Sequence, residues 1–435
     1  MPDHATSTHA AVQAQLDRLA TLSPGADILG LERIAALLSR LGDPHLSLPP
    51  VFHVAGTNGK GSTCAFLRAA IEAAGHSVHV FSSPHLVRFN ERIRIAGHLI
   101  ADDHLAALLA EVLDVADGIR PSFFEVTTAA AFLAFARTPA AATIVEVGLG
   151  GRLDATNVVA APAVTGIAAL GMDHEAFLGT SATGIAAEKA GIAKPGVPLV
   201  TMDYARPLRD RIAAVAAQTG APVIARGREW NSDTARSTMR YSDDGFSVVT
   251  NRPQLVGAHQ SRNLALAIAM LRHQGALHIP EAAYRAAADW AQWPARMQRL
   301  SPGPLTDRLP PASELWIDGA HNPSAAAPVA RALRTIAQGR PVTLVLGMLA
   351  NKDAAGVLRL LSSSIARVIA VPVSGHAHHA PQSLADIAGQ FGPAATTAHS
   401  LEQALDLVRD PAPVLIAGSL YLAGEALAAN DEPPA

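Results

Sequence analysis

A short stretch of the 435-residue chain combines glycines, one lysine and hydroxyl side chains at a spacing suited to binding phosphate. Residues 56–63 read Gly-Thr-Asn-Gly-Lys-Gly-Ser-Thr and follow an apolar run. Backbone N–H groups of a glycine-rich turn can approach phosphate oxygens, Lys60 supplies a compact positive charge, and the hydroxyl of Ser62 or Thr63 can face a metal ion. The usual P-loop spacing is absent, because Val54 stands where the first glycine belongs and an extra glycine, Gly61, follows the lysine. We predict a phosphate-binding loop here; the alternative is a structural tight turn.

Three polar residues elsewhere in the chain could hold a metal ion beside such a loop. Glu146 lies in the apolar run 143–147, where a carboxylate is costly unless it binds a cation or forms an ion pair. Ser83 and His174 each follow a strand-like run, and loops at the carboxyl ends of strands in an open α/β sheet meet in one crevice. We predict Glu146 as a magnesium ligand, with a buried ion pair as the alternative. Taken singly, His174 is better explained as an ordinary loop histidine.

Lysine is nearly absent from the chain. Of 34 basic residues, the only lysines are Lys60, Lys189, Lys194 and Lys352. Arginine can replace lysine at most surface positions, but it is neither a compact point charge for a phosphate nor readily deprotonated. Each remaining lysine is therefore a candidate for a chemical role, with a solvated surface position as the alternative.

The elements that must position these residues form an alternating α/β pattern. Apolar residues recur at helical spacing over 8–22 and 30–42. Short apolar runs, typical of buried parallel strands, alternate with alanine-rich helical stretches and cover residues 51–55, 77–81, 143–147, 163–168 and 197–201. This pattern predicts a doubly wound α/β fold, an open parallel sheet with helices on both faces. Residues 240–249 contain an Asp-Gly turn and predict a small antiparallel insertion.

A second α/β unit is predicted beyond a proline-rich stretch. Residues 299–313 contain four prolines in a polar context, which suits neither a helix nor a central strand. Further strand-like runs then alternate with helical segments and cover residues 315–317, 342–346, 368–373 and 414–417. We therefore predict a main domain over 1–298, a linker over 299–313 and a smaller domain over 314–435.

The composition excludes several classes of protein. Hydrophobic residues make up 49% of the chain and charged residues 16%, so a large core can form and general disorder is excluded. A net charge near −3 without basic tracts argues against nucleic acid as the main partner. The single cysteine, Cys64, excludes a disulfide framework, and the absence of a signal peptide or membrane-spanning run predicts a cytoplasmic protein. The histidine-rich residues 375–380 lack a spaced fourth ligand and predict a loop rather than a metal site.

Several long motifs resemble the folylpolyglutamate synthase and dihydrofolate synthase family. They occur in order over nearly the whole chain, at residues 56–63, 82–94, 146–157, 188–192 and 318–323. The resemblance implies an ATP-dependent amide ligase of the Mur-ligase-like superfamily, with an N-terminal P-loop-type ATPase domain and a Rossmann-like C-terminal domain. In this family ATP phosphorylates a carboxylate, and the amine of L-glutamate attacks the acyl phosphate. No side-chain nucleophile is required, in agreement with a chain that offers no convincing Ser/His/Asp or Cys/His arrangement.

The resemblance also implies roles for residues at the ATP and metal sites. Those implied to bind ATP are Thr57, Asn58, Gly59, Lys60, Gly61, Ser62, Asn263, Arg296 and Asp318. Those implied to hold Mg²⁺ are Ser83, Glu146 and His174, so three separate candidates become one site. Lys189 matches a lysine that is carbamylated in similar enzymes, and the carbamate could hold a second Mg²⁺ or orient Lys60. The alternative is an ordinary ion pair with Glu188 or with a neighbouring residue.

Of the implied residues, we expect Lys60, Lys189 and His321 to act in catalysis. His321 follows the predicted strand 315–317 at its carboxyl end, where a second substrate would dock. Lys352 lies in an altered form of a family motif, which leaves its role open, and nothing in the sequence explains Lys194.

A further group of residues matches positions that contact the pteroate in similar enzymes. The group comprises Ser122, Phe123, Phe124, Glu125, Leu153, Asp154 and Ala155. Aromatic rings suit stacking on a flat heterocycle, although a place in the core explains Phe123 or Phe124 at least as well. The loop 150–157 has the form found in bacterial enzymes that act on both dihydropteroate and folates, so we predict a bifunctional enzyme that adds L-glutamate to dihydropteroate and to tetrahydrofolate polyglutamates. The alternative is folylpolyglutamate synthase alone, whose members tend to differ at the pair matching Arg152 and Leu153.

Two other functions remain open from the sequence. A cell-wall Mur ligase shares ATP and the acyl phosphate, but it usually carries a separate N-terminal domain, and only about 50 residues precede the phosphate loop here. A non-catalytic ATP-binding switch protein would keep the phosphate loop but would have no need for Asp318, His321 or Lys189. The family resemblance suggests a monomer.

Overall fold

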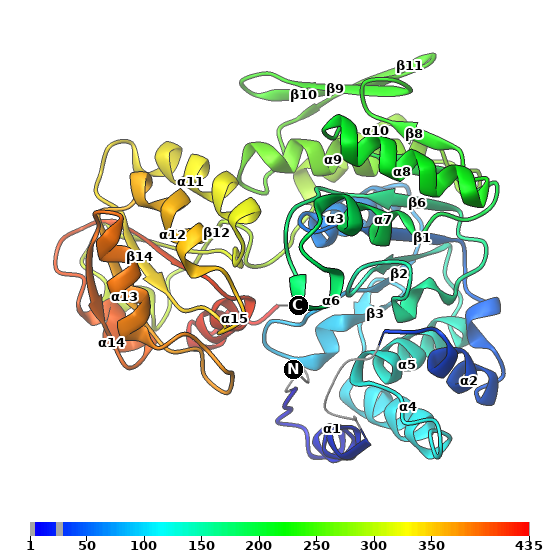
Figure 1. Ribbon diagram of the computed structural model, residues 1–435, viewed down its shortest axis with the longest axis horizontal. Helices are drawn as coiled ribbons and strands as arrows, with labels where there is room; N and C mark the ends of the chain where they lie inside the picture. The colour runs from blue at the N-terminus through cyan, green and yellow to red at the C-terminus, as the bar shows by residue number, and fades with distance from the viewer. Residues whose placement is uncertain (1–4, 23–28, 435) are drawn as a thin grey trace. The chain divides into compact units, whose positions relative to one another are not determined.

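The computed structural model describes residues 5–22 and 29–434, which form two compact units (Figure 1). The N-terminal unit contains Met1–His85, Phe89–Gln254 and Gln260–Gln292. The C-terminal unit contains Trp293–Ala435 together with two short segments from the first part of the chain, Leu86–Arg88 and Leu255–His259. The chain therefore passes between the units several times.

The N-terminal unit is built on an eight-stranded sheet with the order β4-β3-β2-β5-β1-β6-β7-β8. The strands are β1 (Val51–Ala55), β2 (Val78–Phe81), β3 (Ile93–Ile95), β4 (His98–Leu99), β5 (Ala142–Glu146), β6 (Val164–Ile167), β7 (Leu199–Thr201) and β8 (Val223–Ala225). Strands β2, β5, β1, β6, β7 and β8 are parallel, and β3 and β4 add an antiparallel edge. Every residue of β1 and β5 is buried, as expected for a parallel sheet covered on both faces. The predicted doubly wound α/β fold is confirmed.

Helices cover both faces of this sheet (Figure 1). They are α1 (Ala10–Leu22), α2 (Glu32–Arg40), α3 (Lys60–Ala73), α4 (Asp102–Asp114), α5 (Phe123–Arg137), α6 (Glu175–Leu178), α7 (Ala182–Ala190), α8 (Arg206–Thr219), α9 (Ala258–Arg272) and α10 (Glu281–Trp290). Helices α1, α2, α4 and α5 share one apolar core, and α7 and α8 pack on another with β6 and β7. The short 3₁₀ helix η3 (Ala155–Val158) lies between β5 and β6 in the chain.

The predicted antiparallel insertion is present as a three-stranded sheet. It consists of β9 (Trp230–Thr234), β10 (Thr238–Asp243) and β11 (Phe246–Asn251). The turn between β10 and β11 is the Asp244-Gly245 pair, and Gly245 has a φ of 74°. The hairpin is thus confirmed, with β9 as a third strand.

The C-terminal unit has a six-stranded sheet with the order β12-β13-β17-β14-β15-β16. The strands are β12 (Gln298–Arg299), β13 (Glu314–Ile317), β14 (Thr343–Leu346), β15 (Arg367–Ala370), β16 (Ala394–Thr397) and β17 (Pro413–Ala417), and all but β12 pair in parallel. The helices are α11 (Pro323–Ala337), α12 (Ala354–Leu361), α13 (Pro381–Gln390), α14 (Leu401–Asp406) and α15 (Leu420–Ala429).

The proline-rich residues 299–313 lie inside the C-terminal unit. Leu300, Leu305 and Leu309 are buried in its core, and β12 adds an edge strand to its sheet. Burial of these three leucines fixes the segment to the unit, although its prolines are typical of a linker.

Within the described ranges, none of the helices has the length and apolar character needed to cross a membrane.

Candidate active site

The predicted phosphate-binding loop joins the carboxyl end of β1 to the first turn of α3. Gly59 caps this helix with a φ of 84°, and a Cβ on it would lie 2.6 Å from Asn263 Oδ1 of α9. Thr57 donates its backbone N–H to Ala169 O at 2.8 Å and its hydroxyl to Gly171 O at 2.9 Å. The loop is therefore bonded to the segment that follows β6. A side chain at position 59 would collide with Asn263, so glycine is required there.

The loop presents polar groups that suit a phosphate. Lys60 begins α3, and its Nζ lies 3.5 Å from Thr57 O. The hydroxyl of Ser62 is buried and has no hydrogen-bond partner among the described residues. A buried hydroxyl without a partner is costly, so a ligand oxygen or a metal ion at the helix N-terminus would satisfy it.

The structure also brings Asn263 to this loop. Its Nδ2 donates to Gln260 Oε1 at 3.0 Å, one turn earlier on α9, and both side chains are buried. Sequence reasoning missed Gln260, because only the fold shows that it orients Asn263.

Two of the three predicted metal ligands meet at the neighbouring strand. β1 pairs with β5 so that Val54 lies opposite Glu146, which places Glu146 at the carboxyl edge of the sheet. The Glu146 carboxylate is buried, and its Oε2 accepts the backbone N–H of Ser83 at 3.4 Å. Oxygen donors from a carboxylate and a hydroxyl fit Mg²⁺, which keeps water or phosphate oxygens in its remaining positions.

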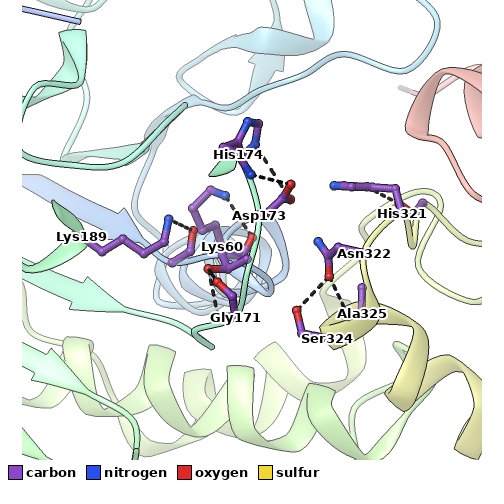
Figure 2. A network of polar contacts seen from close by, with 12 residues as sticks. Lys60, Gly171, Asp173, His174, Lys189, His321, Asn322, Ser324 and Ala325 are labelled. Atoms are coloured by element: carbon purple, nitrogen blue, oxygen red, sulfur yellow. Dashed lines mark hydrogen bonds and ion pairs between the residues drawn. The ribbon is translucent and has the colours of Figure 1, made fainter. Parts of the chain in front are cut away.

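The third predicted ligand, His174, lies at the start of α6. It has a φ of 53°, and its Nε2 is 3.9 Å from Asp173 Oδ2. Figure 2 shows this pair on the loop that follows β6, together with Lys60 and Lys189. The described residues contain no group of three or more His, Cys, Asp or Glu side chains arranged to hold a metal; the predicted set has only two such residues beside its serine.

Lys189 is a buried lysine directed at the phosphate loop. It lies in α7, and its Nζ donates to Gly56 O at 3.0 Å (Figure 2). Burial, helped by repulsion from Lys60, lowers the pKa of Lys189 to about 7, while Asp173 and Asp154 act in the opposite direction. Glu188, the partner named for an ordinary ion pair with Lys189, pairs instead with Arg152 at 2.9 Å.

The residues matched to the pteroate site have well-defined contacts. Ser122 and Glu125 form a capping box at the start of α5, and Glu125 also pairs with Arg33 at 3.1 Å. Phe123 is buried in the core, where it meets Phe89 edge to face. That is the alternative kept open for Phe123.

Phe124 differs from its neighbour. It is half-buried and lies against Phe81, with ring centroids 5.7 Å apart. A Cβ on Gly148 would lie 2.5 Å from Phe124 Cζ, so the loop after β5 passes directly beside this ring. Phe124 therefore has the partial exposure that a stacking surface needs.

Leu153, Asp154 and Ala155 lie where that loop enters η3. The Asp154 carboxylate is buried and accepts the backbone N–H groups of Leu149 at 2.8 Å and Thr156 at 3.0 Å. Desolvation raises the pKa of Asp154, and these hydrogen bonds oppose the rise. Lys194, which the sequence left unexplained, donates to Asn157 O at 2.9 Å and anchors η3.

In the C-terminal unit, Arg296, Asp318 and His321 gather at the carboxyl end of β13. The buried Asp318 carboxylate accepts the N–H groups of Met297 and Ala320, both at 2.8 Å. Desolvation raises the pKa of Asp318, while nearby Arg296 lowers it. His321 Nδ1 lies 2.8 Å from Gly319 O.

The backbone on both sides of Arg296 is unusual. Ala295 and Met297 have φ values of 56° and 46°, which residues other than glycine rarely adopt. No sequence signal announces this turn.

The histidine-rich residues 375–380 lie between β15 and α13, and the predicted loop is confirmed. His379 Nε2 lies 2.9 Å from the backbone oxygen of Lys352, which accepts its hydrogen bond. This contact gives the His379 side chain a structural partner and leaves the role of the Lys352 side chain open.

Comparisons with known proteins cover both units. Residues 305–420 match the family described as Mur ligase, glutamate ligase domain. The chain is 35% identical over 393 residues to the dihydrofolate synthase/folylpolyglutamate synthase of Escherichia coli (strain K12), covering 90% of this chain and 89% of that protein. It is 34% identical over 351 residues to the protein of the same description from Bacillus subtilis (strain 168), covering 77% and 79%.

Solved structures agree over almost the full length. The E. coli FolC structure in complex with DHPP and ADP has a TM-score of 0.88 and 33% identity, covering 97% of each chain. A bifunctional folylpolyglutamate synthase/dihydrofolate synthase with Mn, AMPPNP and L-glutamate bound has a TM-score of 0.85 and 32% identity, covering 97% of this chain and 99% of that one.

Proposed function

Because the chain belongs to the dihydrofolate synthase/folylpolyglutamate synthase family of Mur ligases, we propose how its own residues carry out that family's reaction. The enzyme is an ATP-dependent glutamate ligase with both dihydrofolate synthase and folylpolyglutamate synthase activities. The predictions of family, reaction and bifunctionality are thus confirmed, and the separate assignments to residues are developed below.

The reaction must activate a carboxylate before an amine can attack it. The substrate carboxylate attacks the γ-phosphorus of ATP, which releases ADP and gives an acyl phosphate. The amine of L-glutamate then attacks the acyl carbon, loses a proton and expels inorganic phosphate as the amide forms. The protein mainly positions the reactants, stabilises charge on the transferred group and excludes water.

The phosphate loop 56–63 binds the ATP phosphates. Lys60 offsets the charge that develops on the transferred phosphoryl group, and the buried Ser62 hydroxyl faces the phosphate or its metal ion. The observation that carries this proposal is the convergence of Lys60, the buried Glu146 and the buried Lys189 at the carboxyl ends of β1 and β5.

Glu146, Ser83 and His174 would hold a Mg²⁺ ion. The buried Glu146 carboxylate and its contact with the Ser83 backbone support this assignment. The bound ion would neutralise phosphate charge.

Lys189 takes up CO₂ as a carbamate. A neutral amine attacks CO₂, and the product loses a proton to become an anionic group. With its pKa near 7, Lys189 is substantially neutral under physiological conditions, unlike an exposed lysine. The carbamate would hold a second Mg²⁺ or orient Lys60.

The C-terminal unit supplies Arg296 and Asp318 to the nucleotide and His321 to the glutamate side of the reaction. Asp318 is held rigidly by two backbone N–H groups, and Arg296 lies in a constrained turn beside it. Rigid placement of this kind suits residues that must meet a ligand in one geometry.

The pteridine part of the substrate stacks on Phe124 and contacts the loop Leu153–Asp154–Ala155. The half-buried ring of Phe124 and the buried carboxylate of Asp154 support this choice. Ser122 and Glu125 fix the start of the helix that carries Phe124. We further propose that the enzyme acts as a monomer in the cytoplasm, where ATP and glutamate are supplied.

The test is ADP release from the purified protein with L-glutamate, measured first with dihydropteroate and then with tetrahydrofolate. Release with both acceptors is expected. Release with neither would contradict the function, and release with tetrahydrofolate alone would remove the dihydrofolate synthase activity.

A further inference from the structure

Behind the loop that carries Asp154, three buried polar side chains form one hydrogen-bonded chain. Thr156 Oγ1 donates to Asp154 Oδ1 at 2.5 Å, and the same Oγ1 lies 2.8 Å from His53 Nε2. The three residues are 2%, 0% and 0% exposed, in the order Asp154, Thr156, His53. These hydrogen bonds connect the loop to the middle of β1, and none of the three side chains has appreciable access to solvent.

The direction of the hydrogen bonds follows from chemistry. Three donors converge on the Asp154 carboxylate, from the backbone N–H groups of Leu149 and Thr156 and from the Thr156 hydroxyl, so both of its oxygens act as acceptors here. Desolvation raises the pKa of Asp154, and these hydrogen bonds oppose that rise. Since Thr156 has a single hydroxyl proton and gives it to Asp154, His53 Nε2 must be the donor to Thr156.

The state of His53 agrees with this direction. His53 Nδ1 is buried without a hydrogen-bond partner among the described residues, as expected if it carries the lone pair. Burial, together with the positive charge of Lys194, lowers the pKa of His53 to about 3, so the ring is neutral at pH 7. The neutral His53 imidazole therefore donates a hydrogen bond to the Thr156 hydroxyl, and that hydroxyl donates one to the Asp154 carboxylate.

We propose that Thr156 and His53 are positioning residues for the pteridine site, which hold the Asp154 carboxylate in the single orientation that the substrate meets. This rests on the proposed function, in which Asp154 contacts the substrate. A carboxylate has about four acceptor positions, and the protein occupies three of them, which leaves capacity for one N–H donor of the heterocycle.

His53 is a fixed point in the molecule. It pairs with Val145 of β5 and Thr165 of β6 in the centre of the sheet, and three residues later β1 enters the phosphate loop at Gly56. One strand therefore positions both the phosphates of ATP and, through Thr156, the pteridine loop.

The test compares Thr156→Val, which keeps the shape and removes the hydroxyl, with Thr156→Ser, which keeps the hydroxyl. Steady-state KM values for dihydropteroate, ATP and L-glutamate are measured together with kcat. We expect Thr156→Val to raise the KM for dihydropteroate by about 10-fold or more, because a hydrogen bond to a buried charge is lost, with the KM for ATP within about twofold of wild type. Thr156→Ser should restore most of the affinity.

The second link is tested with a matched pair of histidines. His53→Gln keeps an N–H donor and should stay near wild type, whereas His53→Leu should raise the KM for dihydropteroate. His79 is the control: it is a buried histidine of β2, bonded to Thr138 O and the Ala96 N–H, so His79→Leu should lower stability without changing this KM selectively.

The outcomes separate the two levels of the proposal. A wild-type KM for dihydropteroate in Thr156→Val, or equal rises in all three KM values that Thr156→Ser does not reverse, would overturn the positioning role. If Thr156→Val does not fold, Thr156→Ala and the His53 variants give the same comparison. A wild-type enzyme that turns over tetrahydrofolate but not dihydropteroate would instead contradict the dihydrofolate synthase activity itself.

Discussion

Three of the four lysines of the chain have distinct surroundings in the N-terminal unit. Lys60 begins α3 at the phosphate loop, Lys189 is buried against Gly56 of the same loop, and Lys194 donates to the backbone of η3. In the proposed mechanism two of these positions use properties that arginine lacks: a compact charge at Lys60 and a neutral amine at Lys189. The rarity of lysine thus singled out two residues that the structure places at the same loop, and their chemical roles stay predictions.

We predict that Lys60→Arg and Lys189→Arg each abolish most of the ligase turnover while the protein stays folded. A guanidinium neither fits beside a phosphate as a point charge nor forms a carbamate. Turnover is measured by ADP release and folding by thermal unfolding. Lys194→Arg is the matched control and should retain activity, since a guanidinium can also donate to Asn157 O; near wild-type turnover in either of the first two variants would contradict their assigned roles.

Carbamylation of Lys189 should depend on pH in a stated direction. Its pKa of about 7 means that the protonated, unreactive amine dominates below pH 7 and the neutral amine above it. Occupancy by ¹³C-labelled CO₂, followed by NMR, should therefore rise from pH 6 to pH 8 and be absent in Lys189→Arg. A wild-type protein without a carbamate signal at pH 8 would leave Lys189 as an unmodified lysine.

Some site residues gave no signal before the fold was known. Gln260 orients Asn263, and Asp173 lies beside His174, yet a glutamine or an aspartate in these settings looks like any other polar residue. The left-handed backbone of Ala295 and Met297 is equally silent, because it depends on contacts made across the C-terminal unit. Motif residues were predictable because glycine, lysine and buried carboxylates have few other reasons to occur together.

At the scale of elements, the loop after β5 controls the position of the Phe124 ring. Gly148→Ala should displace this ring, because the new Cβ would lie 2.5 Å from Cζ and a side chain yields more easily than the backbone. We expect the KM for dihydropteroate to rise several-fold, with the KM for ATP and the melting temperature nearly unchanged. Gly275→Ala, where a Cβ meets no atom within 4 Å, is the control; equal KM values in both variants would show that Phe124 does not bind substrate.

The histidine at the centre of β1 should make the fold acid-sensitive. The pKa of His53 is about 3 in the folded protein and near 6.5 when unfolded, so the unfolded state binds the proton first as the pH falls. Stability is therefore lost from about pH 6.5 down to pH 3, by up to about 5 kcal/mol. In His53→Gln this part of the denaturant-measured pH profile should be flatter than in wild type; parallel profiles would contradict the assigned pKa.

The strands of both sheets were largely predictable, and the exceptions are instructive. Buried parallel strands such as β1 and β5 are continuous apolar runs, which the sequence shows clearly. β12 has only two residues, and β16 consists of small residues that are exposed or half-buried, so neither forms an apolar run. In residues 299–313 the prolines indicated a linker, but three buried leucines bind the segment to the C-terminal unit. Apolar anchors outweighed the turn-forming composition.

The segment Leu86–Arg88 belongs to the C-terminal unit, although it comes shortly after Ser83 and the end of β2 in the N-terminal unit. Its Leu86 packs against the core of that unit, and Gly424 of α15 leaves no room for a Cβ beside the Leu86 carbonyl. The fit of one glycine therefore fixes a segment that starts three residues after a proposed metal ligand.

We predict that Gly424→Ala lowers the melting temperature by several degrees and speeds tryptic cleavage after Arg88, because the added methyl group displaces backbone rather than a flexible side chain. The KM for Mg·ATP should rise as Ser83 loses its fixed position. Gly389→Ala, where a Cβ meets nothing within 4 Å, is the control. Unchanged proteolysis in Gly424→Ala would show that the segment is held by other contacts.

The repeated passage of the chain between its units also limits how the gene can recombine. A C-terminal unit made of one continuous piece could be exchanged between related ligases by a single crossover. Here the unit also includes Leu86–Arg88 and Leu255–His259, which precede Trp293 in the sequence. A chimera joined only near Trp293 would combine a new C-terminal unit with two segments from the other parent, so exchanging the whole unit takes more than one crossover.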